Sequence, residues 1–365
     1  MLLWLLFFAF AIAGCKHEVE GDTTEHAYVA VPQVALRDRV ATVYNKVGVV
    51  NNGDKVRILD RSGNKRFARV RAPSGAEGWI EMRYLVGQQI YDQFAALAKR
   101  NAEAPTQATA VARRVVNMHV QPARDSEKLY QIREGDKLDL LQRSVTAKSG
   151  MRSMKQEPKT EEDKLHEKDM EVKEPEEPAS TPAGKTKVPA KRAKASSAVA
   201  DPLEDWWLVR DNQKHVGWVL GRILDVEVPL EIAQYAEGQH IVAAFVINEV
   251  DDETEGKKVP QYVVLMSEPR DGMPFDYNQM RVFTWNRKRT RYETAFRDRF
   301  DGVLPFSISK TDFGKEGVLP VFIARQKDSQ GHLIERKYKM NGVIVRRVTA
   351  PGEAPPARAG RRGRK

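Results

Sequence analysis

An internal repeat constrains the fold of this chain more than any other feature of its sequence. Residues 34–61 align without gaps on residues 116–143, so that Gly53-Asp54-Lys55 in the first copy falls on Gly135-Asp136-Lys137 in the second. In each copy the Gly-Asp pair lies between runs of alternating apolar residues, a pattern typical of a β-hairpin turn. Because a repeated pattern indicates a repeated fold, the sequence predicts two small β modules.

Both copies end with the same signature, a Gly-Trp pair followed by a short apolar close. The signatures are Gly78-Trp79-Ile80…Arg83-Tyr84-Leu85 and Gly217-Trp218-Val219…Arg222-Ile223-Leu224. This layout resembles the bacterial SH3-like (SH3b) family, a small barrel of short strands whose pattern includes W-x-x-V, G-W-V and a final Y/I-L. In the second copy Trp206-Trp207-Leu208-Val209 fits W-x-x-V, whereas the first copy has Phe67 in place of the family's Trp. The resemblance implies SH3-like domains at 28–87 and 114–228, with Trp79 and Trp218 in the barrel cores.

Residues 88–113 separate the two copies and place apolar side chains at helical spacing. Ile90, Phe94, Leu97 and Ala98 recur three or four residues apart, which predicts a short amphipathic helix. We expect this helical connector to dock on the first barrel.

The second copy is interrupted by an insertion, residues 148–204, that lacks aromatic residues from Lys148 to Glu204. An acidic block, Glu157 to Glu177, precedes a basic block, Lys185 to Lys194, and prolines are scattered through both. Such a composition buries too little apolar surface to offset the entropy of ordering, so we expect disorder.

Residues 238–349 read as a third β region. The candidate strands are 240–250, 259–267, 279–286, 290–297, 303–309, 317–325, 332–339 and 342–348. Turn signals separate them, including Asp301-Gly302 and the hairpin signal Asn341-Gly342. The predicted fold class is therefore mainly β: two SH3-like barrels and a C-terminal antiparallel β sandwich or barrel. Residues 350–365 form a basic tail that we expect to be disordered.

The first 15 residues form an apolar run that ends in the only cysteine of the chain, Cys15. The run is too short to span a bilayer and is typical of a signal peptide, here residues 1–14. Ile12-Ala13-Gly14-Cys15 resembles the lipobox of bacterial lipoproteins, which implies a mature chain lipidated at Cys15 and tethered to a membrane by residues 15–27. Lys16 is not the aspartate that resembles an inner-membrane retention signal, which favours the periplasmic face of the outer membrane. An ordinary signal peptide, or a buried apolar segment, is the alternative.

The sequence lacks several common motifs of catalytic or metal-binding residues. Cys15 is the only thiol, and the seven histidines show no H-E-x-x-H or similar metal-ligand spacing. No Gly-x-Ser-x-Gly elbow or phosphate-binding glycine loop is present. We therefore predict a protein that is not an enzyme and needs no cofactor or metal.

A formal net charge of +10 favours anionic partners. At an envelope surface these would be lipid headgroups, lipopolysaccharide or acidic wall polymers, reached in part through the basic tail, rather than nucleic acid.

Aromatic residues in the two repeats are candidate ligand contacts. Trp206 is expected to be mostly buried, and the alternation of the strand then turns Trp207 outward, where an exposed indole often contacts a ligand. Tyr44, Tyr84 and Tyr130 are weaker candidates for the same kind of groove.

A basic segment of the third region, 281–297, interleaves cations with aromatic rings. One interpretation is a hairpin whose tip, Arg287-Lys288-Arg289, binds an anionic polymer or glycan. The other is structural, with the rings as cross-strand core residues and the tip as a solvated turn; we favour it for the rings and leave both open for the tip. The acidic run 251–256 suits a hard cation, but lacks EF-hand spacing and is better interpreted as an exposed hairpin loop.

Together these observations predict a non-catalytic, lipid-anchored envelope protein whose SH3-like modules contact peptidoglycan or envelope proteins. The alternatives are an enzyme that acts on wall glycans or lipids through the C-terminal β domain, and an envelope assembly scaffold.

Overall fold

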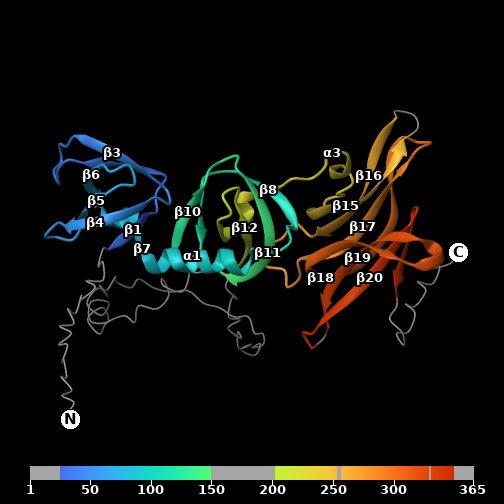
Figure 1. Cartoon of the computed structure of the whole chain (residues 1–365). Helices are drawn as coiled ribbons and strands as arrows, with labels where there is room; N and C mark the ends of the chain where they lie inside the picture. Colours follow the sequence, from blue (N-terminus) through green and yellow to red (C-terminus); the bar gives the residue numbers. More distant parts are fainter. Residues whose placement is uncertain (1–24, 149–201, 253–255, 329, 349–365) are drawn as a thin grey trace, which may run out of the picture. The chain divides into compact units, whose positions relative to one another are not determined.

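The structure, a computed structural model, describes residues 25–148, 202–252, 256–328 and 330–348 (Figure 1). These residues form three seven-stranded antiparallel sheets, which confirms the mainly β fold class. The predicted signal peptide, Cys15, most of the tether, nearly all of the insertion and the basic tail lie outside the described residues. The chain divides into two compact units between Tyr91 and Asp92, and each is described by itself.

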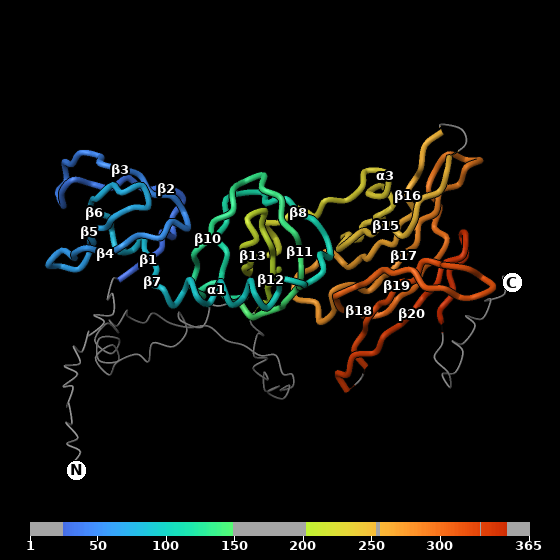
Figure 2. Tube along the Cα trace, viewed as in Figure 1, coloured from blue at the N-terminus to red at the C-terminus, as the bar shows by residue number. Residues whose placement is uncertain are grey.

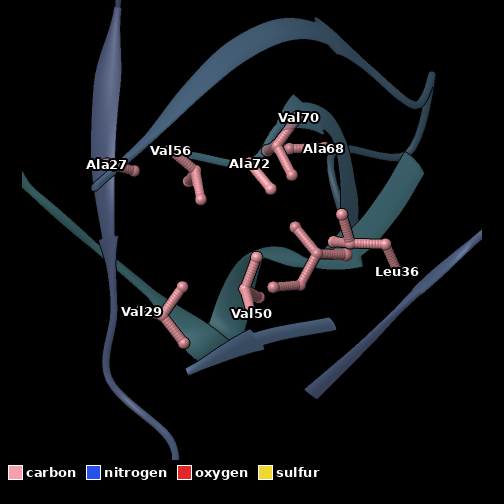
Figure 3. Packing of buried hydrophobic residues seen from close by; sticks show 9 residues of the cluster. Ala27, Val29, Leu36, Val50, Val56, Ala68, Val70 and Ala72 are labelled. Atoms are coloured by element: carbon pink, nitrogen blue, oxygen red, sulfur yellow. The ribbon is translucent and has the colours of Figure 1, made fainter. Parts of the chain in front are cut away.

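Residues 26–87, called module 1 here, form the first sheet, with the order β3-β2-β6-β5-β4-β1-β7 (Figures 1 and 2). Its strands are β1 (His26–Val29), β2 (Gln33–Arg37), β3 (Lys46–Asn51), β4 (Lys55–Arg61), β5 (Phe67–Arg71), β6 (Glu77–Glu81) and β7 (Leu85–Gly87), with a 3-10 turn, η1 (Met82–Tyr84), before β7. Alternate residues point inward and fill one small core (Figure 3). The buried core consists of Ala27, Val29, Leu36, Val50, Val56, Ala68, Val70, Ala72 and Ile80.

Residues 108–148 and 202–226, called module 2 here, repeat this topology in the order β10-β9-β13-β12-β11-β8-β14. The strands are β8 (Ala108–Ala112), β9 (Val116–His119), β10 (Lys128–Ile132), β11 (Lys137–Ala147), β12 (Leu203–Arg210), β13 (Val216–Leu220) and β14 (Leu224–Val226), with a 3-10 turn, η2 (Gly221–Ile223). The turn glycines of the repeat, Gly53 and Gly135, both have φ of 83°, a conformation that glycine adopts without strain. The sequence repeat is thus a repeat of strand order.

The Gly-Trp signature places its glycine, not its tryptophan, toward each module's interior. A Cβ at Gly78 would lie 2.8 Å from Cβ of Leu36, and one at Gly217 would lie 2.6 Å from Cβ of Met118. Since neighbouring residues of a strand face opposite sides, the tryptophans turn outward and are half-buried. The expectation that Trp79 and Trp218 fill the barrel cores is therefore wrong.

Helix α1 (Gln88–Arg100) follows β7 and crosses the boundary between the two units. In its first turn the Tyr91 ring stacks on Tyr28 of module 1, with centroids 4.1 Å apart. Its two buried side chains, Phe94 and Leu97, instead pack on module 2. The expectation that the connector docks on the first barrel is therefore wrong for its apolar face. No described helix is both long and apolar enough to cross a membrane.

The helix finds apolar partners on module 2 because one outward position differs between the repeats. Leu208 opposes Trp218 in module 2, where Arg69 opposes Trp79 in module 1. Leu97 packs against Leu208, Leu141 and Val216. A charged residue at the equivalent place in module 1 offers no such surface.

Residues 240–348 form the C-terminal domain, a meander in which each strand pairs with its neighbours in the chain (Figure 2). A short helix, α3 (Leu230–Ala233), precedes β15 (His240–Asp252), β16 (Lys257–Ser267), β17 (Tyr277–Asn286), β18 (Arg291–Asp312), β19 (Val318–Lys327), β20 (Leu333–Asn341) and β21 (Ile344–Val348). One half of β18 pairs with β17 and the other with β19. Aromatic rings of β15 and β18–β20 pack against one another, and those of Phe306, Phe322 and Tyr338 are buried.

Strand β18 merges two of the predicted strands. The expected turn at Asp301-Gly302 is part of the ladder, where Gly302 pairs with both Tyr277 and Gln326. A Cβ at Gly302 would lie 2.2 Å from Cε2 of Tyr277. Glycine is present here because the tyrosine ring packs directly on the backbone, not because the chain turns.

Within the second unit, Arg143 of β11 joins module 2 to the C-terminal domain. Its Nη2 donates to both carboxylate oxygens of Asp205 at 2.8 Å, and its Nη1 donates to the Phe275 carbonyl at 2.7 Å and to Asp276 at 3.2 Å. The side chain is only 6% exposed. A buried guanidinium requires such partners, so this network fixes how the two parts meet.

Candidate functional site

A groove on the outer face of module 2 combines an apolar floor with a basic rim, and we call it the cationic groove. Its volume is about 270 Å³. It is lined by Arg114, Val116, Asn117, His119, Arg124, Lys128, Trp206, Leu220, Arg222 and Ile223. These lining residues include no acidic side chain.

The floor of the groove is built by β12, β13 and η2. Trp206 and Leu220 are opposite each other in the ladder, and both are buried together with Ile223. The His119 ring meets Trp206 edge to face, with ring centroids 5.3 Å apart. Trp206 is 2% exposed although it lies on the outer face of the sheet, because these neighbours and Trp218 enclose it.

The rim carries cations, of which one is neutralised by the protein itself. Arg124 donates through Nε to Glu204 at 2.7 Å and through Nη2 to the other carboxylate oxygen. These hydrogen bonds lower the pKa of Glu204 below its ordinary value of 4.5. Within the described residues, Arg114, Lys128 and Arg222 form no ion pair at 4.0 Å or less, although the charge of Arg222 also helps to lower the pKa of Glu204. The groove therefore has an excess of positive charge.

His119 adds an uncharged polar group to the groove. Burial lowers the pKa of His119 below its ordinary value of 6.5, so the ring is neutral near pH 7. Its Nδ1 lies 3.1 Å from the Ser126 carbonyl oxygen, which can only accept a hydrogen bond. The proton therefore lies on Nδ1, and Nε2 is a hydrogen-bond acceptor.

The equivalent face of module 1 is occupied by its own side chains. Glu81 accepts from Arg37 at 3.1 Å and pairs with Arg83 at 2.7 Å. The Arg37 guanidinium also lies 4.3 Å from the centroid of the Tyr44 ring. Arg83 donates to the Tyr84 hydroxyl at 2.9 Å. The predicted contacts Tyr44 and Tyr84 are thus brought together around Glu81, in a cluster where one carboxylate partly compensates two guanidiniums.

The other sequence-predicted residues lie elsewhere. Tyr130 stacks on His215, with centroids 3.7 Å apart, on the side of module 2 that carries Phe94. Arg287, Lys288 and Arg289 are exposed at the β17–β18 hairpin of the C-terminal domain, where Arg289 pairs with Glu293 at 3.0 Å. Cys15 lies outside the described residues.

Trp207 is not the outward indole that the strand alternation predicted. It is 8% exposed and opposes Val219, as Ala68 of the module 1 core opposes Ile80. The ladder therefore places Trp207 on the inward side of β12, and Trp206 is the indole on the outer face. The prediction fails because it took the burial of Trp206 as a sign that Trp206 faces the module interior. Trp206 is instead buried on the outer face, by Leu220, Ile223 and Trp218.

A second cavity, of about 290 Å³, lies at the Arg143 network and is lined partly by Trp207, His240 and Asp271. Burial raises the pKa of Asp271 and of Asp276, and burial lowers the pKa of His240. Arg143 already forms hydrogen bonds with Asp205 and Asp276 at this junction. The cavity is therefore less suited to a charged ligand than the cationic groove.

No group of three His, Cys, Asp or Glu side chains in the described parts of the chain could hold a metal ion. In the acidic run, Asp252 at the end of β15 is 2% exposed and accepts from Nε1 of Trp285 at 3.1 Å. Asp251 and Asp252 pair with Lys258 and Lys257 of β16, and the Asp252 carboxylate is buried rather than exposed. Residues 253–255, on which the predicted loop falls, lie outside the described residues.

Sequence reasoning missed most of the groove, although one signal was present. When the two closing signatures are aligned, Leu220 takes the position of Glu81 and Arg222 takes the position of Arg83. The exchange of an acid for a leucine beside a retained arginine marks where the two repeats differ in charge.

Comparison with known proteins bears on module 1. Residues 33–86 match the bacterial SH3 domain family, from the start of β2 into β7. A search of curated proteins finds no match to the chain. The chain therefore contains a bacterial SH3 domain at residues 33–86.

Proposed function

We propose that this is a non-catalytic, lipid-anchored protein of the bacterial cell envelope whose SH3-like modules contact peptidoglycan or envelope proteins. The observation that carries the proposal is the bacterial SH3 domain at 33–86, a type of module that suggests cell-wall binding. The matching strand order of module 2 supports counting it as a second module of the same kind.

The anchor and the location are part of the proposal. The run Ile12-Ala13-Gly14-Cys15 supports lipidation at Cys15, and Lys16 supports the periplasmic face of the outer membrane. The basic residues of the 350–365 tail would add contacts to anionic polymers or lipids, each contributing ~1 kcal/mol near a charged surface.

Binding without catalysis is supported by the residue inventory. The chain has no cysteine other than Cys15, and its histidine spacings match no common hydrolase motif. The competing function, an enzyme acting through the C-terminal domain, predicts soluble fragments released from labelled wall sacculi. An assembly scaffold predicts partner proteins that co-purify after the wall is digested.

The binding proposal is tested with purified sacculi and the full chain. The protein should sediment with sacculi at low salt and release no labelled fragments from them. Failure to sediment would contradict wall binding.

The anchor is tested separately by Cys15→Ser. The variant should leave the membrane fraction, because serine has no sulfur atom to which the lipid can be attached. Lys16→Asp is the matched control and should stay membrane-bound while moving from the outer to the inner membrane fraction. A membrane-bound Cys15→Ser protein would overturn the anchor.

A further inference from the structure

Resting on the proposed function, we infer that the cationic groove of module 2, and not the equivalent face of module 1, receives the ligand. The ligand is a peptide segment with free carboxylates.

The two modules differ in charge at several pairs of equivalent positions, among them Glu81 against Leu220 and Arg37 against His119. Glu81 opposes Phe67 in module 1, and Leu220 opposes Trp206 in module 2. Glu81 pairs with Arg37 and Arg83 and so compensates one of these two positive charges within module 1. Leu220 cannot do this for Arg222, two residues further along the chain. The same fold therefore presents once a face with an acid among its arginines and once a groove whose lining residues include no acid.

The rim of the groove selects for carboxylates. Arg114, Lys128 and Arg222 lie around a floor whose lining residues include no acid. A guanidinium presents a planar fork of donors that matches the two oxygens of a carboxylate. Glu204, which accepts two hydrogen bonds from Arg124 at the edge of the groove, shows this pairing within the protein.

The floor favours a peptide over a phosphate polymer or a lipid surface. Asn117 and His119 lie two residues apart on β9, on the same face. The Asn117 Oδ1 accepts from Gln131, so its Nδ2 can donate to a ligand, whereas the neutral His119 accepts at Nε2. A peptide amide supplies one acceptor and one donor to match, and its aliphatic side chains can pack on Leu220 and Ile223. A phosphate chain offers His119 no donor.

The ligand chemistry is tested by sedimentation of the full chain with sacculi whose peptide carboxylates have been converted to amides with carbodiimide and ammonia. Amidation leaves glycan and peptide length unchanged, removes the negative charge and replaces one acceptor oxygen of each carboxylate with a donor NH2 group. We expect affinity to fall by about 10-fold or more, equivalent to ~1.4 kcal/mol. Unchanged affinity would overturn the inference.

The choice of module is tested by a matched pair of variants, Arg222→Gln and Arg83→Gln. Both residues are exposed, so both variants should unfold at the urea concentration of the unaltered protein. Arg222→Gln should weaken binding to untreated sacculi by about 10-fold, and Arg83→Gln should leave it within about 2-fold. Equal losses in both variants, or a loss only in Arg83→Gln, would overturn the assignment to module 2.

Phosphatidylglycerol vesicles separate a lipid phosphate from a peptide carboxylate. We expect Arg222→Gln to change vesicle binding far less than sacculus binding. If the variant loses vesicle binding and keeps sacculus binding, the groove recognises phosphate and the inference fails. If the unaltered chain binds no sacculi at all, the proposed function itself fails, a result distinct from binding that is insensitive to amidation.

Discussion

Trp206 and Trp207 are adjacent and both buried, yet the ladder assigns them to opposite faces of β12. Trp207 has the position of Ala68 in the module 1 core, whereas Trp206 is covered from outside by Leu220, Ile223 and Trp218. Trp207 is therefore buried in the module interior, whereas Trp206 is buried in the floor of the cationic groove on the outer face. Only Trp206 is near the cationic rim.

The Arg124–Glu204 pair predicts an acid sensitivity of module 2. Because Arg124 lowers the folded-state pKa of Glu204, the unfolded state binds the proton more tightly, and the pair's stabilisation is lost as pH falls below 4.5. We expect Glu204→Gln to lower the free energy of unfolding by about 1–2 kcal/mol at pH 7 and by less at pH 3. Urea titrations at a series of pH values measure the difference.

The exposed Glu227→Gln is the control for this titration. Its pair with Lys137 lies at the surface, so the variant should stay within about 0.5 kcal/mol of the unaltered protein at pH 7. A Glu204→Gln penalty that does not shrink with acid would contradict the assignment of the pH dependence to this carboxylate.

At the scale of elements, helix α1 is defined by its own sequence, but its docking surface is not. The helical spacing of Phe94 and Leu97 predicts an apolar stripe, and the structure buries that stripe on module 2. Nothing in the spacing says which neighbour covers it. The choice depends on Leu208 in one repeat and Arg69 in the other, residues that become neighbours of the helix only in the folded chain.

The docking of α1 predicts that Leu97→Ala destabilises the second unit. Leu97 is 7% exposed, and truncation of a buried leucine costs about 2–3 kcal/mol when the cavity does not collapse. Urea unfolding followed by tryptophan fluorescence should report this loss.

Lys99→Ala, an exposed change on the same helix, should alter the stability by less than about 0.5 kcal/mol. Equal stabilities of the Leu97→Ala and Lys99→Ala proteins would show that the helix does not rely on module 2.

At the scale of the whole molecule, the second unit is held together at a buried charge network. Arg143, Asp205 and Asp276 come from β11, β12 and the segment before β17, so the network connects module 2 to the C-terminal domain. Removal of one partner leaves the opposite charges buried without compensation, which costs more than the pair contributes.

This network predicts that Arg143→Met lowers the free energy of unfolding by about 3–5 kcal/mol at pH 7. The loss should shrink toward acid pH, because burial already raises the pKa of Asp276 and removal of the guanidinium favours the protonated acid further. Urea unfolding at pH 7 and pH 4 measures both effects.

The triple change Arg143→Met, Asp205→Asn and Asp276→Asn provides the control, since it removes the uncompensated charges. It should recover part of the stability lost in Arg143→Met alone. A loss in the single variant that is the same at both pH values, with no recovery in the triple variant, would point to packing rather than charge.

The sequence by itself determined the strands, the repeat and the mainly β class, because alternation of apolar residues and glycine turns are local properties of the chain. Gly53 and Gly135 correctly predict equivalent turns in the two repeats. Gly302 shows the limit of such signals, since a glycine required by the Tyr277 ring looks the same in sequence as a glycine required by a turn.

Only the tertiary structure decided which faces are covered and which charges remain uncompensated. Alternation defines two faces of β12 but does not say that Trp207 is inward or that Leu208 receives a helix. The contrast between Glu81 and Leu220 becomes a difference between a partly compensated face and a groove lined by cations without an acid once the arginines around them are in place. The physical reason is that burial and electrostatic compensation depend on neighbours distant in sequence, which the fold alone brings together.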